Sequence, residues 1–275
     1  MSLANQHGRL ASLGFVRYAT GLFRCELEHY TIDALVRSES QLVVCFDHAG
    51  IAESQPSRDR LGWGLGFVLN HTDKSGLFIK PTESNWFRKP GLYKLFEQLE
   101  KSGFIGVYDS IITYGGSMGG YAAIAYADAL HAEKVLSLNP QATLDAAIVP
   151  WETRFPRGMR QDWSSFPQNA AEGCQNASEV VVVFDRLCQK DARHAALLNI
   201  PGRVELNVPF VGHGIPYHLR KMGLLERLFD DVASGAFSLS EWHRLIRMRR
   251  LLDEYRNVID KKCAARASRS DQQDP

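Results

Sequence analysis

Short apolar runs and helical apolar stripes alternate along this chain. Two of the runs, at 42–46 and 179–184, are almost unbroken, which is typical of strands buried in a parallel sheet. Elsewhere apolar residues recur every three or four positions, as in the 85–102 segment, which indicates helices. The pattern predicts strands at 25–37 (one or two edge strands), 42–46, 66–69, 76–79, 110–114, 134–138, 179–184 and 204–208, and helices at 85–102, 121–130 and 191–198.

The alternation of strands with helices predicts an α/β fold of three layers, with helices on both faces of a mostly parallel central sheet. We expect one domain over residues 1–262, because no internal repeat divides the chain. Between 141 and 178 the periodicity disappears and prolines accumulate, together with Trp151 and Trp163. Linkers rarely carry tryptophan, so we interpret this segment as an irregular cap or lid inserted over the sheet. Residues 263–275 are expected to form a disordered tail.

The chain after Pro216 is mostly helical in pattern and ends in an amphipathic stripe. Its apolar residues follow steps of three and four, while the opposite face is basic. Two interpretations stay open: the helix packs on its own domain, or it forms the seam of a homodimer. The stripe consists of Leu245, Met248, Leu252, Tyr255 and Ile259.

Composition and charge exclude several classes of function. With 32 basic and 31 acidic residues, the net charge is +1, so no bulk field favours nucleic acid or an anionic membrane. The five cysteines are scattered and never spaced C-x-x-C, which argues against a disulfide framework or a zinc site and fits a reducing compartment. No apolar run approaches the ~18 residues of a membrane span, and we find no N-terminal secretion signal. We therefore expect a cytoplasmic protein with no nucleic-acid partner.

The most informative segment, residues 111–125, reads IITYGGSMGGYAAIA. It places the pattern G-x-S-x-G between a predicted strand and a predicted helix, with Ser117 at its centre. A serine on such a tight turn takes strained backbone angles, and side chains two residues before or after it would clash, so glycine is required there. The helix that follows directs its first N–H groups toward the serine, where an oxyanion would form.

A nucleophilic serine needs a base and an acid that orients the base. His213 lies between two glycines just after the last predicted strand, which makes it the candidate base, although a buried structural histidine is the alternative. Two acids follow the 179–184 strand. Asp191 is favoured because a loop lets its carboxylate reach the imidazole, but it also opens a helix, where aspartate is a common N-cap. Asp185, at the strand end, stays open as the alternative acid.

The order Ser117, Asp191 or Asp185, then His213, on alternating strands and helices, resembles the α/β-hydrolase superfamily over residues 25–235. The resemblance implies that Ser117 attacks, that the Met118 N–H helps to bind the oxyanion, and that a second N–H follows an early strand. That place here reads Phe46-Asp47-His48-Ala49-Gly50, which departs from the H-G-G-G form of lipases and esterases.

Several residues around this site are candidates for substrate contact. His48 or Ala49 would supply the second oxyanion donor, while Asp47 either touches substrate or only fixes the turn. Trp86 either lines the mouth of a pocket or packs in the core. From the cap we expect an apolar underside over Ser117 that sets substrate choice, formed by Trp151, Phe155 and Trp163. The run Gly62-Trp63-Gly64-Leu65-Gly66 is not G-x-G-x-x-G and opens no predicted helix, so we reject a dinucleotide site.

These features lead to three hypotheses about function. The first is a serine hydrolase that cleaves a small-molecule ester or thioester through an acyl-enzyme, with no metal or organic cofactor. The second keeps the same three residues but transfers the acyl group to a sugar or an amine. The third is a non-catalytic binding protein with an incomplete triad.

Overall fold

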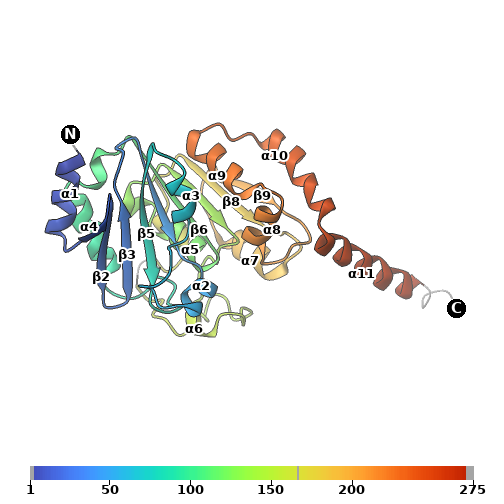
Figure 1. The fold of residues 1–275 in the computed structure, drawn as a ribbon. Helices are drawn as coiled ribbons and strands as arrows, with labels where there is room; N and C mark the ends of the chain where they lie inside the picture. Colours follow the sequence, from blue (N-terminus) through green and yellow to red (C-terminus); the bar gives the residue numbers. More distant parts are fainter. Residues whose placement is uncertain (1–2, 166, 271–275) are drawn as a thin grey trace.

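The computed structural model describes residues 3–165 and 167–270, and its centre is a sheet of nine strands with helices on both faces (Figure 1). The strand order is β1-β2-β3-β5-β4-β6-β7-β8-β9, antiparallel from β1 to β5 and parallel from β5 to β9. This confirms the predicted α/β class. The strands are β1 (Val16–Ala19), β2 (Leu22–Leu27), β3 (Tyr30–Leu35), β4 (Gln41–Phe46), β5 (Lys74–Pro81), β6 (Ser110–Gly116), β7 (Lys134–Leu138), β8 (Glu179–Phe184) and β9 (Val204–Asn207).

Two hydrophobic cores fill the space between the sheet and its two helical layers. One lies under α1, α4 and α5, and the other under α3, α8, α9 and α10. In the described part of the chain they are accompanied by four 3-10 helices: η1 (Ile105–Val107), η2 (Asp128–Leu130), η3 (Ala170–Gly173) and η4 (Ile246–Leu251). The α-helices are α1 (Leu3–Ser12), α2 (Ala49–Ser54), α3 (Leu65–Leu69), α4 (Leu92–Lys101), α5 (Met118–Ala125), α6 (Pro156–Met159), α7 (Gln189–Leu197), α8 (Ile215–Lys221), α9 (Leu225–Ser234), α10 (Leu239–Leu245) and α11 (Asp253–Ser270).

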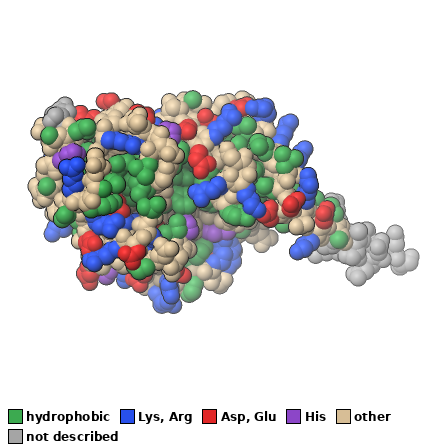
Figure 2. Space-filling model, viewed as in Figure 1, with side chains coloured by type: hydrophobic (Ala, Val, Ile, Leu, Met, Phe, Trp, Pro, Cys, Tyr) green, Lys and Arg blue, Asp and Glu red, His purple; other side chains and the backbone are tan. Residues whose placement is uncertain are grey.

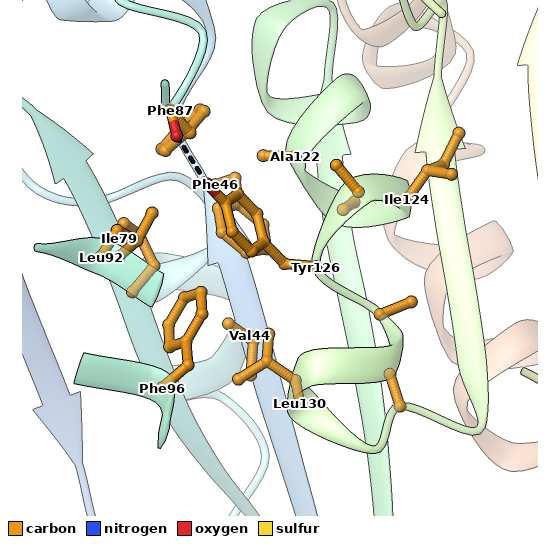
Figure 3. Packing of buried hydrophobic residues seen from close by; sticks show 14 of the residues in the cluster. Val44, Phe46, Ile79, Phe87, Leu92, Phe96, Ala122, Ile124, Tyr126 and Leu130 are labelled. Atoms are coloured by element: carbon orange, nitrogen blue, oxygen red, sulfur yellow. Dashed lines mark hydrogen bonds between the residues drawn. The ribbon is translucent and has the colours of Figure 1, made fainter. Parts of the chain in front are cut away.

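Aromatic packing joins the end of strand β4 to helix α5, which follows Ser117. Phe46, the last residue of β4, contacts the rings of Phe87, Phe96 and Tyr126 at centroid distances of 5.2, 6.5 and 6.0 Å (Figure 3). The Tyr126 hydroxyl donates a hydrogen bond of 2.6 Å to the carbonyl of Phe87. The end of β4 and the helix after Ser117 therefore share one rigid core.

Three expected elements differ in the structure. The helix expected over 121–130 ends at Ala125, and the 3-10 helix η2 follows at Asp128–Leu130. Residues 66–69 are not a strand but part of helix α3. The helix expected over 85–102 begins only at Leu92. Pro90 disfavours helical angles at the residue before it, and Gly91 takes a φ of 100°, so the chain turns here before the helix starts. Trp86 and Phe87 also have positive φ, at 49° and 56°.

The C-terminal stripe is not one continuous helix face. Leu252 is extended and separates η4 from α11, so the residues before and after it do not share a helical register. Met248 is 40% exposed, whereas Ile246 packs in the second core. Helix α11 projects away from the body of the molecule (Figure 1). Its backbone is helical through Ser270, where the sequence pattern indicated a disordered tail, and residues 271–275 lie outside the described residues. The homodimer seam stays a prediction.

The glycines of the elbow are required by close backbone approach. A Cβ on Gly115 would lie 2.2 Å from the Gly119 carbonyl oxygen, and a Cβ on Gly119 would lie 2.2 Å from the Phe46 carbonyl oxygen. Backbone atoms cannot move aside as a flexible side chain can. The two flanking positions of G-x-S-x-G in this chain therefore have no room for a side chain.

We predict that Gly119→Ala lowers the free energy of unfolding by about 1–3 kcal/mol or more, because the added methyl forces α5 away from β4. Urea unfolding followed by circular dichroism measures the loss. Gly8→Ala is the matched control, since its Cβ would meet nothing within 4 Å inside helix α1 and alanine is the better helix former. A Gly119→Ala protein as stable as Gly8→Ala would contradict the proposed packing.

Candidate active site

Ser117 lies on the turn between β6 and α5, near the middle of the sheet. Its φ and ψ are 55° and −119°, a strained combination for a residue with a side chain. The Ser117 N–H is bonded to the carbonyl of Leu138 at 2.8 Å, which holds the turn against the end of β7. The sequence alone predicted this strained position.

Three side chains from distant parts of the chain form a line of hydrogen bonds. The Ser117 hydroxyl lies 2.9 Å from Nε2 of His213. On the other side of the ring, Nδ1 of His213 lies 2.9 and 3.0 Å from the two carboxylate oxygens of Asp191. Since Nδ1 faces a carboxylate, it carries the proton, and Nε2 is left free to accept one from the serine. Asp191 is buried in the first turn of α7. It is the acid that the sequence favoured, and it lies beside the imidazole.

Asp185 has a different place. One of its carboxylate oxygens accepts hydrogen bonds from the N–H groups of Val211 and Gly212, at 2.9 and 2.8 Å. The other accepts one from Leu187 at 2.9 Å. Asp185 therefore fixes the loop that presents His213, while Asp191 contacts the ring itself.

The inserted segment supplies an ionic network behind Asp191 that the sequence analysis missed. Nη1 of Arg154 lies 2.7 Å from Oδ1 of Asp191. The same guanidinium forms three bonds of 2.7 to 3.1 Å with the fully buried carboxylate of Glu152. His194 contacts Glu152 at 3.1 Å from the other side. Residues 152 and 154 give no signal of this role in the sequence, because Asp191 lies 37 positions after Arg154 and His194 lies 42 positions after Glu152.

The pKa values of these groups show how the network supports charge. Burial raises the pKa of Asp191, but the hydrogen bonds and charges of His213 and Arg154 more than offset it, so the net shift is downward. The same balance lowers the pKa of Glu152, where burial is opposed by His194 and Arg154. Both carboxylates are therefore ionised at neutral pH.

Two amides after β7 also reach the site, and neither was predicted. The amide nitrogen of Asn139 lies 3.0 Å from Nε2 and 3.3 Å from Nδ1 of His213. The two ring nitrogens of His213 direct their lone pair or N–H outward in different directions within the ring plane. The Asn139 amide can therefore lie near both only by approaching the face of the ring. The amide nitrogen of Gln141 lies 3.5 Å from the Ser117 hydroxyl, and its oxygen accepts a bond of 3.0 Å from the Trp86 indole. Their position in the sequence could have indicated this, because Asn139 and Gln141 follow the carboxyl end of β7, the strand beside β6.

The candidate oxyanion donors lie at two adjacent helix starts. Met118 is the first residue of α5 and Ala49 the first residue of α2, so their N–H groups have no intrahelical carbonyl to bond. The two starts are in contact, because a Cβ on Gly119 would lie 2.9 Å from the Asp47 carbonyl oxygen. His48 caps α2 through its own Nδ1, which accepts the Ile51 N–H at 3.3 Å.

The electrostatics of His48 lead to a prediction about stability. Burial, together with the charges of His213 and Arg60, lowers the pKa of His48 from 6.5 to about 4. A lowered histidine pKa stabilises the folded state above the unfolded pKa, and this stabilisation is lost as the pH falls through the folded value. The contribution of His48 is about 3 kcal/mol between these limits.

We therefore predict that the free energy of unfolding falls between pH 6.5 and 4, and that His48→Asn has a shallower slope in that window. Asparagine keeps a cap for α2 but does not titrate. Denaturant unfolding across the pH range measures both slopes. Some slope remains in the variant, because burial also lowers the pKa values of His194 and His218. Equal slopes in the two proteins would contradict the assignment.

The remaining candidate substrate contacts are mostly structural. Both carboxylate oxygens of Asp47 are engaged, by Arg60 at 2.9 Å and by the Trp63 N–H at 2.7 Å, so Asp47 fixes the turn. Trp163 is 5% exposed and donates a hydrogen bond from its indole to the Gly158 carbonyl in the first core. Trp151 packs on His194 and lies under the guanidinium of Arg193. Besides Gln141, the 141–178 segment meets the site through Arg154 and Phe155, and the ring of Phe155 lies 5.6 Å from that of His213.

Two cavities adjoin the start of α2. The first, of about 310 Å³, is lined by Ala49, Gly50, Glu53, Trp86, Arg154, Phe155, Pro156 and Arg157. The second, of about 460 Å³, lies between α3 and α9 and is lined mainly by Ile51, Leu61, Trp63, Phe67, Tyr114 and Phe229. Figure 2 shows the hydrophobic side chains of this hollow, with histidine side chains beside it. The ring of Trp63 contacts that of His48 at 5.4 Å, so the second cavity begins next to the turn that precedes α2.

Over the described ranges 3–165 and 167–270, no helix is long and apolar enough to cross a membrane. Within the same ranges, no group of three or more His, Cys, Asp or Glu side chains is arranged to hold a metal ion.

Comparison with solved structures identifies the fold. The capsule O-acetyltransferase of Neisseria meningitidis serogroup A, in complex with CoA, is similar with a TM-score of 0.50 and 10% identity, covering 79% of this chain and 99% of its own. A sugar hydrolase from Lactococcus lactis is similar with a TM-score of 0.50 and 12% identity, covering 83% and 99%. The chain has the α/β-hydrolase fold. No protein-family model and no curated protein sequence matches it.

Proposed function

We propose that this protein is a serine hydrolase that cleaves an ester or thioester through an acyl-enzyme on Ser117. The observation that carries the proposal is the line of contacts from Ser117 through His213 to Asp191, with 2.9 Å between the hydroxyl and Nε2. A strained serine at a helix start, bonded to a histidine whose other nitrogen faces a carboxylate, is the arrangement that activates a hydroxyl for acyl transfer.

Each residue of the site has its own role in the proposed reaction. The Ser117 oxygen attacks the substrate carbonyl while its proton moves to Nε2 of His213. The N–H groups of Met118 and of the His48–Ala49 turn bind the oxyanion that forms. The tetrahedral intermediate collapses, and His213 returns the proton to the departing alcohol or thiol. Water then repeats these steps on the acyl-enzyme and releases the acid. Asp191 keeps the Nδ1 proton in place throughout.

The two cavities support a substrate with a group on each side of the carbonyl. Ala49 belongs to the first cavity, and His48 contacts Trp63 of the second, so the oxyanion turn lies between them. The first cavity has charged walls, while the second is lined mostly by apolar side chains together with the charged Arg220 and Glu226. An ester with one polar and one apolar part matches this division.

The proposal is tested by labelling with a fluorophosphonate probe and by assaying a panel of p-nitrophenyl esters and acyl-CoA thioesters. We expect labelling at Ser117 and turnover of at least one substrate class. A folded protein that neither labels nor turns over any member of the panel would overturn the proposal and favour a non-catalytic binding protein.

An acyltransferase is the second candidate. It is supported by the fold neighbour described above, an O-acetyltransferase whose structure contains CoA. The chemistry is the same up to the acyl-enzyme, after which a sugar hydroxyl or an amine replaces water. Adding such acceptors during turnover distinguishes the two: an acyltransferase forms acylated acceptor in preference to free acid, whereas a hydrolase does not.

A further inference from the structure

The carboxylate of Asp191 contacts two side chains, and only one of them, His213, belongs to the triad. Its Oδ1 lies 3.0 Å from Nδ1 of His213 and 2.7 Å from Nη1 of Arg154. Asp191 is buried, with an exposed fraction of 1%. The His213 ring offers this carboxylate an N–H, whereas the Arg154 guanidinium offers a permanent positive charge that compensates the burial.

Arg154 is itself held in one orientation. Its Nε and Nη2 form a fork with the two oxygens of Glu152, and its guanidinium lies over the ring of Phe155 at 4.9 Å. Glu152 is anchored in turn by the His194 ring and by the backbone N–H of Arg154 at 2.8 Å. A guanidinium fixed in this way restricts the rotation of Asp191, and hence of the imidazole.

The two charges act on the protonated imidazole in opposite directions. Arg154 opposes the attraction between Asp191 and an imidazolium, so it favours the neutral, basic form of His213. Glu152 offsets part of the Arg154 charge and therefore favours the imidazolium. Because all these groups are largely withdrawn from solvent, salt screens their effects weakly.

We propose that Arg154 and Glu152 of the inserted segment are positioning residues of this active site, which orient Asp191 and set the pH at which His213 becomes an effective base. The kinetic consequences of this inference rest on the proposed function. The contacts among Asp191, Arg154 and Glu152 do not depend on it. The cap in this protein is then part of the proton-transfer machinery and not only a cover for substrate.

Other titratable groups lie around the Asp191, Arg154 and Glu152 side chains and are not substituted in the test. They are Cys188, Lys190 and His194 on or beside α7, Asp185 at the end of β8, and His48 at the start of α2.

The test is the pH profile of kcat/KM for three variants. Arg154→Met keeps an unbranched apolar stem and removes the charge, so the acidic limb moves to higher pH by about 0.5–1 unit, and kcat falls as Asp191 loses its orientation. Glu152→Gln moves the limb in the opposite direction. Arg154→Lys restores the charge without the fork, so the limb returns toward the wild-type position while kcat stays low. If the two residues had a purely structural role, Arg154→Met and Glu152→Gln would move the acidic limb in the same direction, or neither would move it.

Arg186→Met is the matched control, because the Arg186 side chain is exposed and its ion pair is with Glu205, at 3.2 Å. It leaves the profile unchanged. If Arg154→Met and Glu152→Gln shift the limb in the same direction, or if neither differs from Arg186→Met, the inference is overturned.

Failure of the proposed function is recognised separately, as a wild-type protein without labelling or turnover at Ser117. In that case the midpoint of the His213 ring signals in an NMR pH titration replaces the kinetic limb. Opposite displacements of this midpoint in Arg154→Met and Glu152→Gln still support the network, and equal displacements still refute it.

Discussion

Ser117→Ala is expected to fold normally and to lose turnover by about six orders of magnitude, together with all labelling by serine-directed probes. The change removes only the oxygen that contacts Nε2 of His213 at 2.9 Å. The strained turn is fixed by Gly115, Gly119 and the Ser117 N–H bond to Leu138, none of which depends on the hydroxyl. Steady-state kinetics and probe labelling measure the loss, and thermal unfolding shows that the fold is kept.

Ser110→Ala is the matched control for this experiment. Ser110 begins the same strand and accepts a hydrogen bond from Gln41 at 3.0 Å, at the opposite end from the elbow. Activity and labelling should persist in that variant. Activity retained by a purified, folded Ser117→Ala protein would show that another group carries the chemistry, and the serine mechanism would be wrong.

Asp191→Asn and Asp185→Asn are expected to fail in different ways. An asparagine at 191 cannot hold the Nδ1 proton of His213 as a carboxylate does, and a ring in the wrong tautomer cannot accept the serine proton. We expect kcat to fall by about 10³–10⁴-fold. The amide oxygen can still accept a bond from Arg154, whose other partner, Glu152, is unchanged, so the protein folds.

Asp185→Asn should act mainly through stability. The carboxylate accepts three backbone N–H groups around the histidine loop, and an amide replaces one acceptor by a donor. The expected cost is about 1–3 kcal/mol in the free energy of unfolding, with a smaller loss of kcat in the protein that remains folded. Kinetics on both variants at a temperature where each is folded separates the effects. A larger kcat defect at 185 than at 191 would reverse the assignment.

The sequence was sufficient where the physical requirement is local. The elbow could be predicted because a strained serine between closely packed backbones needs glycine two positions before and after it, and those residues are adjacent in the chain. The buried parallel strands were also predictable, since a strand covered on both faces, such as β4 or β8, is apolar at every position after its first residue. The position of His213 followed from glycines on both sides of it just after a predicted strand.

The sequence was insufficient where the partner is distant or where packing decides. It favoured Asp191 over Asp185 but left both open, because only the folded structure shows which carboxylate faces the ring and which one faces the loop. It assigned Trp163 and Trp151 to the substrate, whereas the fold uses them in packing, since a large ring in an irregular segment can be buried on either side.

Local pattern alone therefore determined the α/β class, the strained serine and the candidate base in this protein. Only the tertiary structure decided which acid completes the line, that Arg154 and Glu152 of the insertion stand behind it, and where the cavities lie. The physical reason is that these features depend on contacts between residues far apart in the chain. The energies of those contacts depend on burial, which the local sequence pattern does not record.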